Sequence, residues 1–190
     1  MNVKDMLRQA SDAAKQLITL SDQTIIGILK ETAQVLRTHT EEVLAANRQD
    51  LERMDPANPK YDRLKLTEER LQGIAADMEN VSTLPSPLNK VLSETIRPNG
   101  MVIRKVTVPF GVIGVIYEAR PNVTFDVFSL CFRSGNVCVL KGGSDADFSN
   151  RALVRIIHSV LERQGINPAV CTLLPVSYTH LRAHETGAYL

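Results

Sequence analysis

Apolar residues in the first quarter of the chain recur every three or four positions, which predicts amphipathic helices from residue 5 to about residue 53. Ser21 is placed to cap the second helix of this region. The prolines of "MDPANPKYD" then interrupt the pattern. A further amphipathic stretch, "LTEERLQGIAADMENVSTL", has Thr67 as its expected N-cap. These patterns predict a helical region over residues 1–95.

The pattern changes after "RPNG". "MVIRKVTVPF" alternates apolar and polar residues, which predicts a strand with one solvated face. "GVIGVIY" and "NVCVLK" are continuous apolar runs, typical of strands buried on both faces of a parallel sheet. "AVCTLLP" is a third short apolar run, and helical patterns separate the three: "TFDVFSLCFRSG" and "SDADFSNRALVRIIHSVLERQG". The order strand, helix, strand, helix, strand over residues 100–175 predicts an α/β fold with a parallel sheet built from right-handed crossovers.

The composition is that of a soluble globular protein, with 44% apolar and 23% charged residues among 190. The net charge of +1 gives no reason to expect nucleic acid or an anionic membrane as a partner. The polar start lacks the apolar core of a signal peptide. Three cysteines, Cys131, Cys138 and Cys171, lie in apolar surroundings and are expected to be buried structural thiols. Their odd number favours reduced thiols and a cytoplasmic location.

Two loops are expected at the carboxyl ends of the buried strands, where open α/β sheets bind ligands. They are "YEARPNVT", residues 117–124, and "KGGSDAD", residues 141–147. The second combines Lys141, two glycines and a helix N-terminus, which predicts a nucleotide or phosphate site. The usual glycine-rich nucleotide motifs are absent. An equally weighted alternative is that Gly142 and Gly143 only form a tight strand-to-helix turn.

A separate candidate lies at the end of the chain, in "SYTHLRAHETG". His180 and His184 have i,i+4 spacing and Glu185 follows, a pattern that suits a metal ion on a helix. A metal-binding protein is therefore one hypothesis from spacing alone.

The stretch "VPFGVIGVIYEARPNVTFDVFSLCFRSGNVCVLKGGSDADFSN", with "NRQDLE", "YDRLKLTEERL" and "RPNG", resembles the gamma-glutamyl phosphate reductases of the aldehyde dehydrogenase superfamily. The resemblance runs to about Pro175. It implies an aldehyde-dehydrogenase-like fold and NADPH-dependent reduction of L-glutamyl 5-phosphate to L-glutamate 5-semialdehyde, with release of phosphate, in proline biosynthesis. In this family a cysteine thiolate attacks the acyl phosphate. That cysteine should lie beyond residue 190, so the chain resembles the N-terminal part of the enzyme and is expected to be inactive alone.

The resemblance also implies roles for single residues. Asn122 matches the asparagine whose amide stabilises the oxyanion. Lys141 matches the lysine that contacts the adenosine ribose, in the cofactor-binding loop with Gly142 and Gly143. Many relatives that prefer NAD carry a glutamate where this chain has Ser144, which suggests NADPH because a serine would accept the 2′-phosphate. Arg120 is a candidate for holding the substrate's phosphate or carboxylate. It could equally pair with Glu118, and both alternatives stay open.

Two further stretches carry expectations of their own. "VSYTHLRAHET" is similar to one reading frame of a transposon-based sequencing adapter, so residues 176–190 are expected to be a non-native tail, and no metal site is predicted there. "MVIRKVTV" resembles part of the family's extended arm, which implies a homo-oligomer for the complete enzyme. The alternative function, from another class, is an inactive nucleotide-binding or interaction module.

Overall fold

The structure, a computed structural model, describes residues 2–175. Helices form the first part of the chain: α1 (Val3–Leu17), α2 (Asp22–Thr38), α3 (Thr40–Leu51), α4 (Tyr61–Leu64) and α5 (Glu68–Thr83). A hairpin follows, made of β1 (Val91–Ile96) and β2 (Val102–Val106). The remaining elements alternate: β3 (Val112–Ile116), α6 (Asn122–Arg133), β4 (Val137–Lys141), the 3-10 turn η1 (Ser144–Ala146), α7 (Asp147–Arg163), the 3-10 turn η2 (Pro168–Val170) and β5 (Cys171–Leu173).

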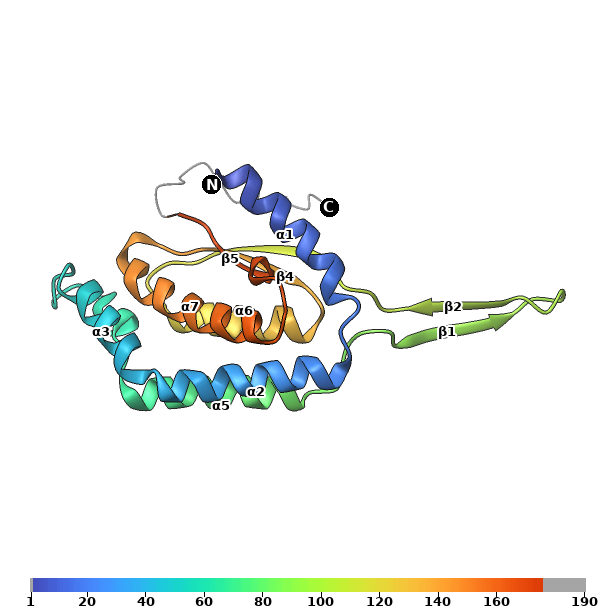
Figure 1. The fold of residues 1–190 in the computed structure, drawn as a ribbon, viewed down its shortest axis with the longest axis horizontal. Coiled ribbons are helices and arrows are strands. Elements are labelled where there is room, and N and C mark those ends of the chain that lie inside the picture. The colour runs from blue at the N-terminus through green and yellow to red at the C-terminus, as the bar shows by residue number, and fades with distance from the viewer. Residues whose placement is uncertain (1, 176–190) are drawn as a thin grey trace.

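The central feature is a three-stranded sheet in the order β3-β4-β5. Both strand pairs are parallel, so each connection crosses over through a helix. Helices α6 and α7 cover one face of the sheet and α1 lies against the other, while α2 and α5 form a further layer beneath α6 and α7 (Figure 1). The α/β class and the parallel sheet predicted from the sequence are confirmed.

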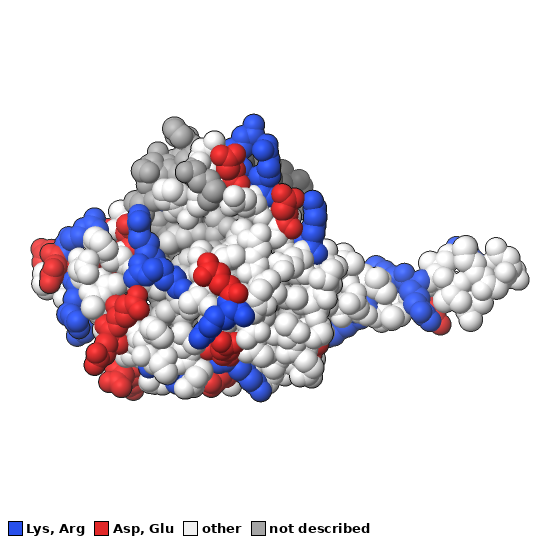
Figure 2. Space-filling view, in the orientation of Figure 1, with Lys and Arg blue, Asp and Glu red and all other residues white. Residues whose placement is uncertain are grey.

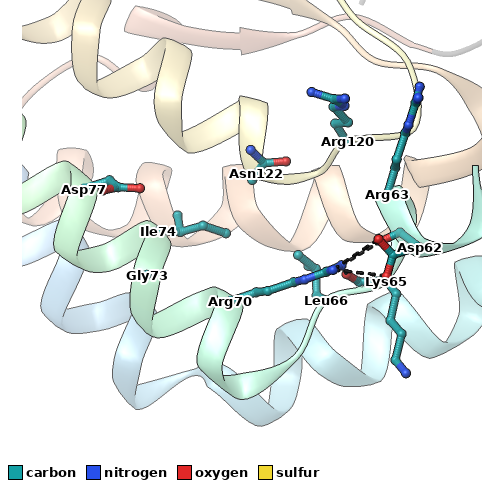
Figure 3. A pocket seen from close by; sticks show the side chains of 10 residues that line it. All are labelled: Asp62, Arg63, Lys65, Leu66, Arg70, Gly73, Ile74, Asp77, Arg120 and Asn122. Atoms are coloured by element: carbon teal, nitrogen blue, oxygen red, sulfur yellow. Dashed lines mark hydrogen bonds and ion pairs between the residues drawn. The ribbon is translucent and has the colours of Figure 1, made fainter.

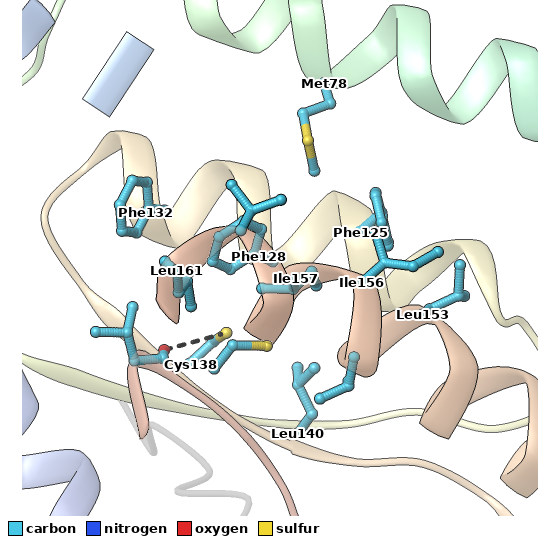
Figure 4. Packing of buried hydrophobic residues seen from close by; sticks show 14 of the residues in the cluster. Met78, Phe125, Phe128, Phe132, Cys138, Leu140, Leu153, Ile156, Ile157 and Leu161 are labelled. Atoms are coloured by element: carbon cyan, nitrogen blue, oxygen red, sulfur yellow. Dashed lines mark hydrogen bonds between the residues drawn. The ribbon is translucent and has the colours of Figure 1, made fainter. Parts of the chain in front are cut away.

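The core lies between the sheet and the helices α6 and α7 (Figure 4). Phe128 and Phe132 stack with ring centroids 5.2 Å apart. Phe125, one turn before Phe128, is also fully buried. Each such side chain stabilises the fold by about 1.5–3 kcal/mol through removal of apolar surface from water. Helix α6 is thus held rigidly, which matters because its first residue is a candidate site residue.

Local capping predictions hold. The Ser21 side chain accepts a hydrogen bond from the Thr24 amide at 3.0 Å, and the Thr67 side chain accepts one from the Arg70 amide at 3.2 Å. Both satisfy amides that a helix start leaves without a partner.

The predicted helical region over residues 1–95 is wrong at its end, because Val91–Ile96 forms β1. "RPNG" is the turn that joins β1 to β2: the Gly100 amide donates to the Arg97 carbonyl at 2.8 Å, and Gly100 has a φ of 83°. The hairpin projects from the body (Figure 1), and every residue of both strands is exposed. The single solvated face predicted for the second strand is therefore wrong, since both of its faces are exposed. Figure 2 shows few charged atoms near the hairpin tip and charges of both signs over the body.

Strand β3 also differs from expectation. It was predicted to be buried on both faces, but Val112 and Ile116 are 39% and 53% exposed. The reason is its place at the edge of the sheet, where α1 covers only part of one face. Ile113 and Val115 face the core, so β3 behaves as a strand with one buried face.

Candidate functional site

Two loops meet at the carboxyl ends of β3 and β4. We call residues 117–121 the β3 loop and residues 142–146 the β4 loop. The Tyr117 amide donates to the Lys141 carbonyl at 3.1 Å, which continues the strand pairing into the loops. Gly143 lies so close to the β3 loop that a Cβ there would be 3.4 Å from the Cα of Glu118. The two predicted site loops are therefore neighbours in space.

Asn122 is the first residue of α6, directly after the β3 loop. Pro121 precedes it with a φ of −58°, which suits the entry into a helix. The Asn122 side chain is half-buried, and its Nδ2 donates to Oδ2 of Asp126 at 3.0 Å. Burial raises the pKa of the Asp126 carboxyl, the bond from Asn122 lowers it, and the charge of Asp77 raises it.

Asn122 lines a cavity of about 320 Å³ between α5, α6 and the segment around α4 (Figure 3), which we call the Asn122 cavity. Its other lining residues are Asp62, Arg63, Lys65, Leu66, Arg70, Gly73, Ile74, Asp77 and Arg120. Four of these side chains are cations and two are carboxylates. The cavity is therefore suited to a ligand that carries more negative than positive charge.

The Arg120 guanidinium has no carboxylate within 4.0 Å among residues 2–175. The Glu118 carboxylate instead pairs with Nζ of Lys60 at 3.1 Å. The alternative in which Arg120 pairs with Glu118 is therefore wrong. Arg70, by contrast, is held by the Asp62 carboxylate at 3.1 Å and by two backbone carbonyls at 2.6 Å. Arg120 is thus better placed than Arg70 to meet a ligand.

Lys141, at the end of β4, lies on a different side of the strand ends. It borders an apolar groove of about 240 Å³ lined by Leu7, Val112, Gly114, Val115, Ile116, Val139, Lys141 and Leu174. Its Nζ donates to the neighbouring Gly142 carbonyl at 3.0 Å. Ser144 is exposed. Lys141 thus borders an apolar surface, and neither Lys141 nor Ser144 lines the Asn122 cavity.

The two glycines of the β4 loop are explained by packing. A Cβ on Gly142 would be 2.3 Å from Nδ2 of Asn150, a buried residue of α7. Gly143 allows the close approach to Glu118 described above. The alternative left open from the sequence, that both glycines serve the strand-to-helix turn, accounts for them without a ligand.

Two amides at the start of α7 already have an acceptor within the chain. Asp50, from α3 and 1% exposed, accepts from the Phe148 amide at 3.1 Å and from the Ser149 amide at 2.8 Å. It also accepts from the Ser149 hydroxyl at 2.6 Å. Burial raises the pKa of Asp50, and these hydrogen bonds lower it. A carboxylate of the chain itself thus binds two of the amides at this helix N-terminus, and the nucleotide or phosphate site expected at residues 141–147 stays a prediction.

Asn47 and Asp50 were missed from the sequence. The Asn47 side chain accepts from the Leu66 amide at 2.8 Å and donates to the Leu64 carbonyl at 2.9 Å and to the Ser149 hydroxyl at 3.0 Å. The available signal was that Asn47 and Asp50 share a helix face with the buried Val43 and Ala46. Polar residues on an apolar face are buried with partners or not at all.

The cysteines are buried, as predicted. Burial raises the pKa of Cys131 to about 12. The pKa of Cys138 is raised by its contact with the Cys171 thiol and by burial. The raised pKa values of Cys131 and Cys138 disfavour the thiolate form that a nucleophile requires.

Within residues 2–175, no group of three or more His, Cys, Asp or Glu side chains is arranged to hold a metal ion. His180, His184 and Glu185, and the whole predicted tail 176–190, lie outside the described residues. A helix long and apolar enough to cross a bilayer is likewise absent from residues 2–175.

Comparison with known proteins gives a consistent result. No family model matches the chain. Over 175 residues it is 99% identical to the gamma-glutamyl phosphate reductase of Parabacteroides distasonis, a match that covers 92% of the chain and 42% of that protein. The structure of the gamma-glutamyl phosphate reductase of Thermotoga maritima has a TM-score of 0.86 at 32% identity, covering 90% of this chain and 42% of that one.

The fold extends to more distant proteins. The structure of an NAD-dependent benzaldehyde dehydrogenase from Corynebacterium glutamicum matches with a TM-score of 0.68 at 18% identity, over 90% of this chain and 35% of that one. The chain thus spans about two fifths of the length of the reductases that it matches. By sequence, the chain is similar to gamma-glutamyl phosphate reductases over about two fifths of their length, and it has an aldehyde-dehydrogenase-like fold.

Proposed function

We propose that the chain supplies part of the active site of an NADPH-dependent reductase that converts L-glutamyl 5-phosphate to L-glutamate 5-semialdehyde and phosphate, a step of proline biosynthesis in the cytoplasm. The observation that carries this proposal is that Asn122 and Arg120 line one cavity at the carboxyl end of β3 (Figure 3). The names of the similar reductases support the substrate and the reaction.

Asn122 is the donor to the oxyanion. When a thiolate adds to the acyl carbon, the carbonyl oxygen gains a negative charge, and a fixed amide N–H stabilises that charge. One such donor typically lowers the barrier by about 3 kcal/mol. The thiolate comes from a residue outside this chain, because the pKa values of Cys131 and Cys138 are raised and all three cysteines are buried.

Arg120 is the partner for an anionic group of the substrate. A guanidinium can hold a phosphate or a carboxylate through two parallel N–H bonds. L-Glutamyl 5-phosphate carries both groups, and the excess of cations around the Asn122 cavity favours such a ligand.

The cofactor lies on the Lys141 side. Bound NADPH would supply the hydride that reduces the acyl group. Lys141 would donate to the adenosine ribose, and Ser144 leaves room for a 2′-phosphate because it is exposed and uncharged. The apolar groove beside Lys141 fits a flat ring better than a phosphate. The closed start of α7 means that the pyrophosphate needs donors from elsewhere in the complete protein.

The exposed hairpin favours one further assignment, that the complete protein is a homo-oligomer. Ile96, Met101 and Val108 are 68%, 53% and 72% exposed, and β1 and β2 bury no residue within the chain. Apolar surface of this kind marks an interface. The same observation supports the second candidate function, an interaction module without chemistry of its own.

Kinetics separate the two candidates. We expect the 190-residue chain to show no NADPH oxidation with freshly generated glutamyl phosphate. In the complete P. distasonis reductase, Asn122→Ala at the matching position should lower kcat roughly 100- to 1000-fold. The matched control Asn80→Ala, on the exposed side of α5, should leave kcat unchanged. An unchanged kcat in the Asn122→Ala enzyme would refute the proposed role.

A further inference from the structure

We propose that Asp126 is a positioning residue, which fixes the Asn122 amide so that one of its N–H groups points into the Asn122 cavity. The proposal rests on the proposed function, since it concerns the same asparagine. It adds a residue one helical turn from the cavity wall.

The two residues are fixed relative to each other by α6. Positions i and i+4 of a helix share one face, and the Nδ2 of Asn122 lies 3.0 Å from Oδ2 of Asp126. Both side chains are half-buried, so water competes only partly for this bond. Phe125 and Phe128, which are fully buried on a different face of α6, resist rotation of this helix. The Asp126 carboxylate therefore has a fixed position relative to the Asn122 amide.

The chemistry of the two groups selects one amide orientation. The two ends of an amide have nearly the same shape, but the nitrogen donates two hydrogen bonds and the oxygen only accepts. An ionised carboxylate only accepts, so it binds the nitrogen end of Asn122 and repels the oxygen end. One hydrogen on Nδ2 then bonds to Asp126 and the second remains for the oxyanion. Without Asp126, the amide is free to turn its oxygen toward the oxyanion, which would raise the barrier.

The negative charge of Asp126 would repel an oxyanion that forms near Asn122, so other charges must offset it. Asp77 on α5 adds a second carboxylate near it, and both burial and Asp77 raise the pKa of Asp126. Four cationic side chains line the same cavity and offset these charges: Arg63, Lys65, Arg70 and Arg120. The carboxylate thus orients the amide inside a cavity whose lining is cationic.

Nuclear magnetic resonance on the whole chain tests the orientation directly. With ¹⁵N-asparagine labelling, the Asn122 side-chain signals are assigned by their loss in Asn122→Ser. We expect its two amide protons to be well separated in shift and to exchange slowly, since one is bound to a carboxylate. Asp126→Ala should bring both to the values of a solvated asparagine, with unchanged backbone signals in β4 and α7. Asp77→Ala, a nearby carboxylate without this bond, should leave the separation intact. Unmoved Asn122 signals in the Asp126→Ala chain would overturn the proposal.

Kinetics of the complete P. distasonis reductase then separate positioning from the proposed function. At the matching positions, Asp126→Ala should lower kcat roughly 10- to 100-fold with KM unchanged within about twofold, as expected for an interaction made in the transition state. Asp126→Asn keeps an acceptor and should recover part of the loss. The double variant should be no slower than Asn122→Ala alone, because Asp126 acts through Asn122. Additive losses would overturn positioning, whereas an unchanged kcat in Asn122→Ala would overturn the role of Asn122 itself.

Discussion

The β3 loop and the β4 loop lie side by side, but the charges next to them have opposite signs. The β3 loop leads into Arg120 and Asn122, whose side chains face a cavity with an excess of cations. The β4 loop leads into α7, whose first amides are bound by the carboxylate of Asp50. One strand end is therefore open to an anionic ligand, while the helix start beside it already has an internal anion.

The binding of the α7 amides by Asp50 shows that a helix N-terminus can bind an external anion only where its amides lack a partner in the chain. Sequence patterns favoured the β4 loop, because it has a cation, two glycines and a helix start. The structure explains the glycines by the proximity of Asn150 and Glu118. The candidate substrate residues Arg120 and Asn122 thus line the cavity beside the β3 loop, and Lys141 borders the apolar groove.

The largest expected effect on stability comes from removing the internal anion. Asp50→Ala leaves the Phe148 and Ser149 amides without their acceptor in a buried place. We expect the free energy of unfolding to fall by about 2–4 kcal/mol, measured by urea denaturation. Asp12→Ala, at an exposed position of α1, is the matched control and should change it by less than about 0.5 kcal/mol. Equal effects of the two substitutions would mean that the α7 start is not held by Asp50.

The next prediction concerns Arg120, which lines the Asn122 cavity. In the complete P. distasonis reductase, Arg120→Ala should raise KM for glutamyl phosphate roughly 30-fold, because a charge-assisted bond of about 2 kcal/mol is lost. Arg120→Lys keeps the positive charge but loses the two parallel N–H donors, so its KM should lie between those of the native enzyme and Arg120→Ala. Glu118→Ala is the control, since Glu118 pairs with Lys60 rather than with Arg120. A rise in KM for Glu118→Ala as large as for Arg120→Ala would restore the pairing that the structure contradicts.

A third prediction concerns the packing of the β4 loop. Gly142→Ala places a methyl group 2.3 Å from the buried Asn150 amide and should destabilise the chain by about 1–3 kcal/mol. Gly27→Ala, in the interior of α2 with no atom within 4 Å of the new methyl, should stabilise it by up to about 1 kcal/mol. Thermal unfolding of both variants measures the contrast. A neutral Gly142→Ala would show that packing does not explain this glycine.

The smallest effect is a pH dependence. Burial raises the folded-state pKa of Asp50 above its unfolded value of about 3.9. The stability that Asp50 contributes is thus fully present below about pH 4, and part of it is lost as the pH rises through the folded pKa. Since Asp50→Asn cannot titrate there, the stability advantage of the native chain over this variant should be larger at pH 4 than at pH 7. Denaturation at several pH values checks this. An advantage that grows with pH would contradict the direction of the shift.

The sequence predicted those features that depend on neighbouring residues. Ser21 and Thr67 cap helices within three positions, and the crossovers between apolar strands follow from local order. It did not predict the capping of α7, because Asp50 and Ser149 are 99 positions apart. It also misjudged β3, whose burial depends on which strands and helices lie beside it rather than on its own apolar run.

At the candidate site too, the sequence predicted local features but not contacts between distant residues. Asn122 and Arg120 were identified by their motif, and the structure places both on one cavity. Their surroundings were not predictable, since Arg63, Arg70 and Asp77 come from a different part of the chain. Of the exposed hairpin, only β2 was predicted as a strand. The apolar pattern of β1 was too weak to distinguish it from the helical region before it.

The most direct test of the difference between the two loops is a titration of the ¹⁵N-labelled chain with inorganic phosphate, followed by nuclear magnetic resonance. Phosphate serves as the probe because it carries the charge of the proposed leaving group. The account predicts saturable shifts of the Arg120 side-chain signal and of the Asn122 amide, which Arg120→Ala abolishes. It also predicts that the Phe148 and Ser149 amides do not move, because Asp50 already binds them. Shifts of Phe148 and Ser149 without shifts of Arg120 and Asn122 would contradict it.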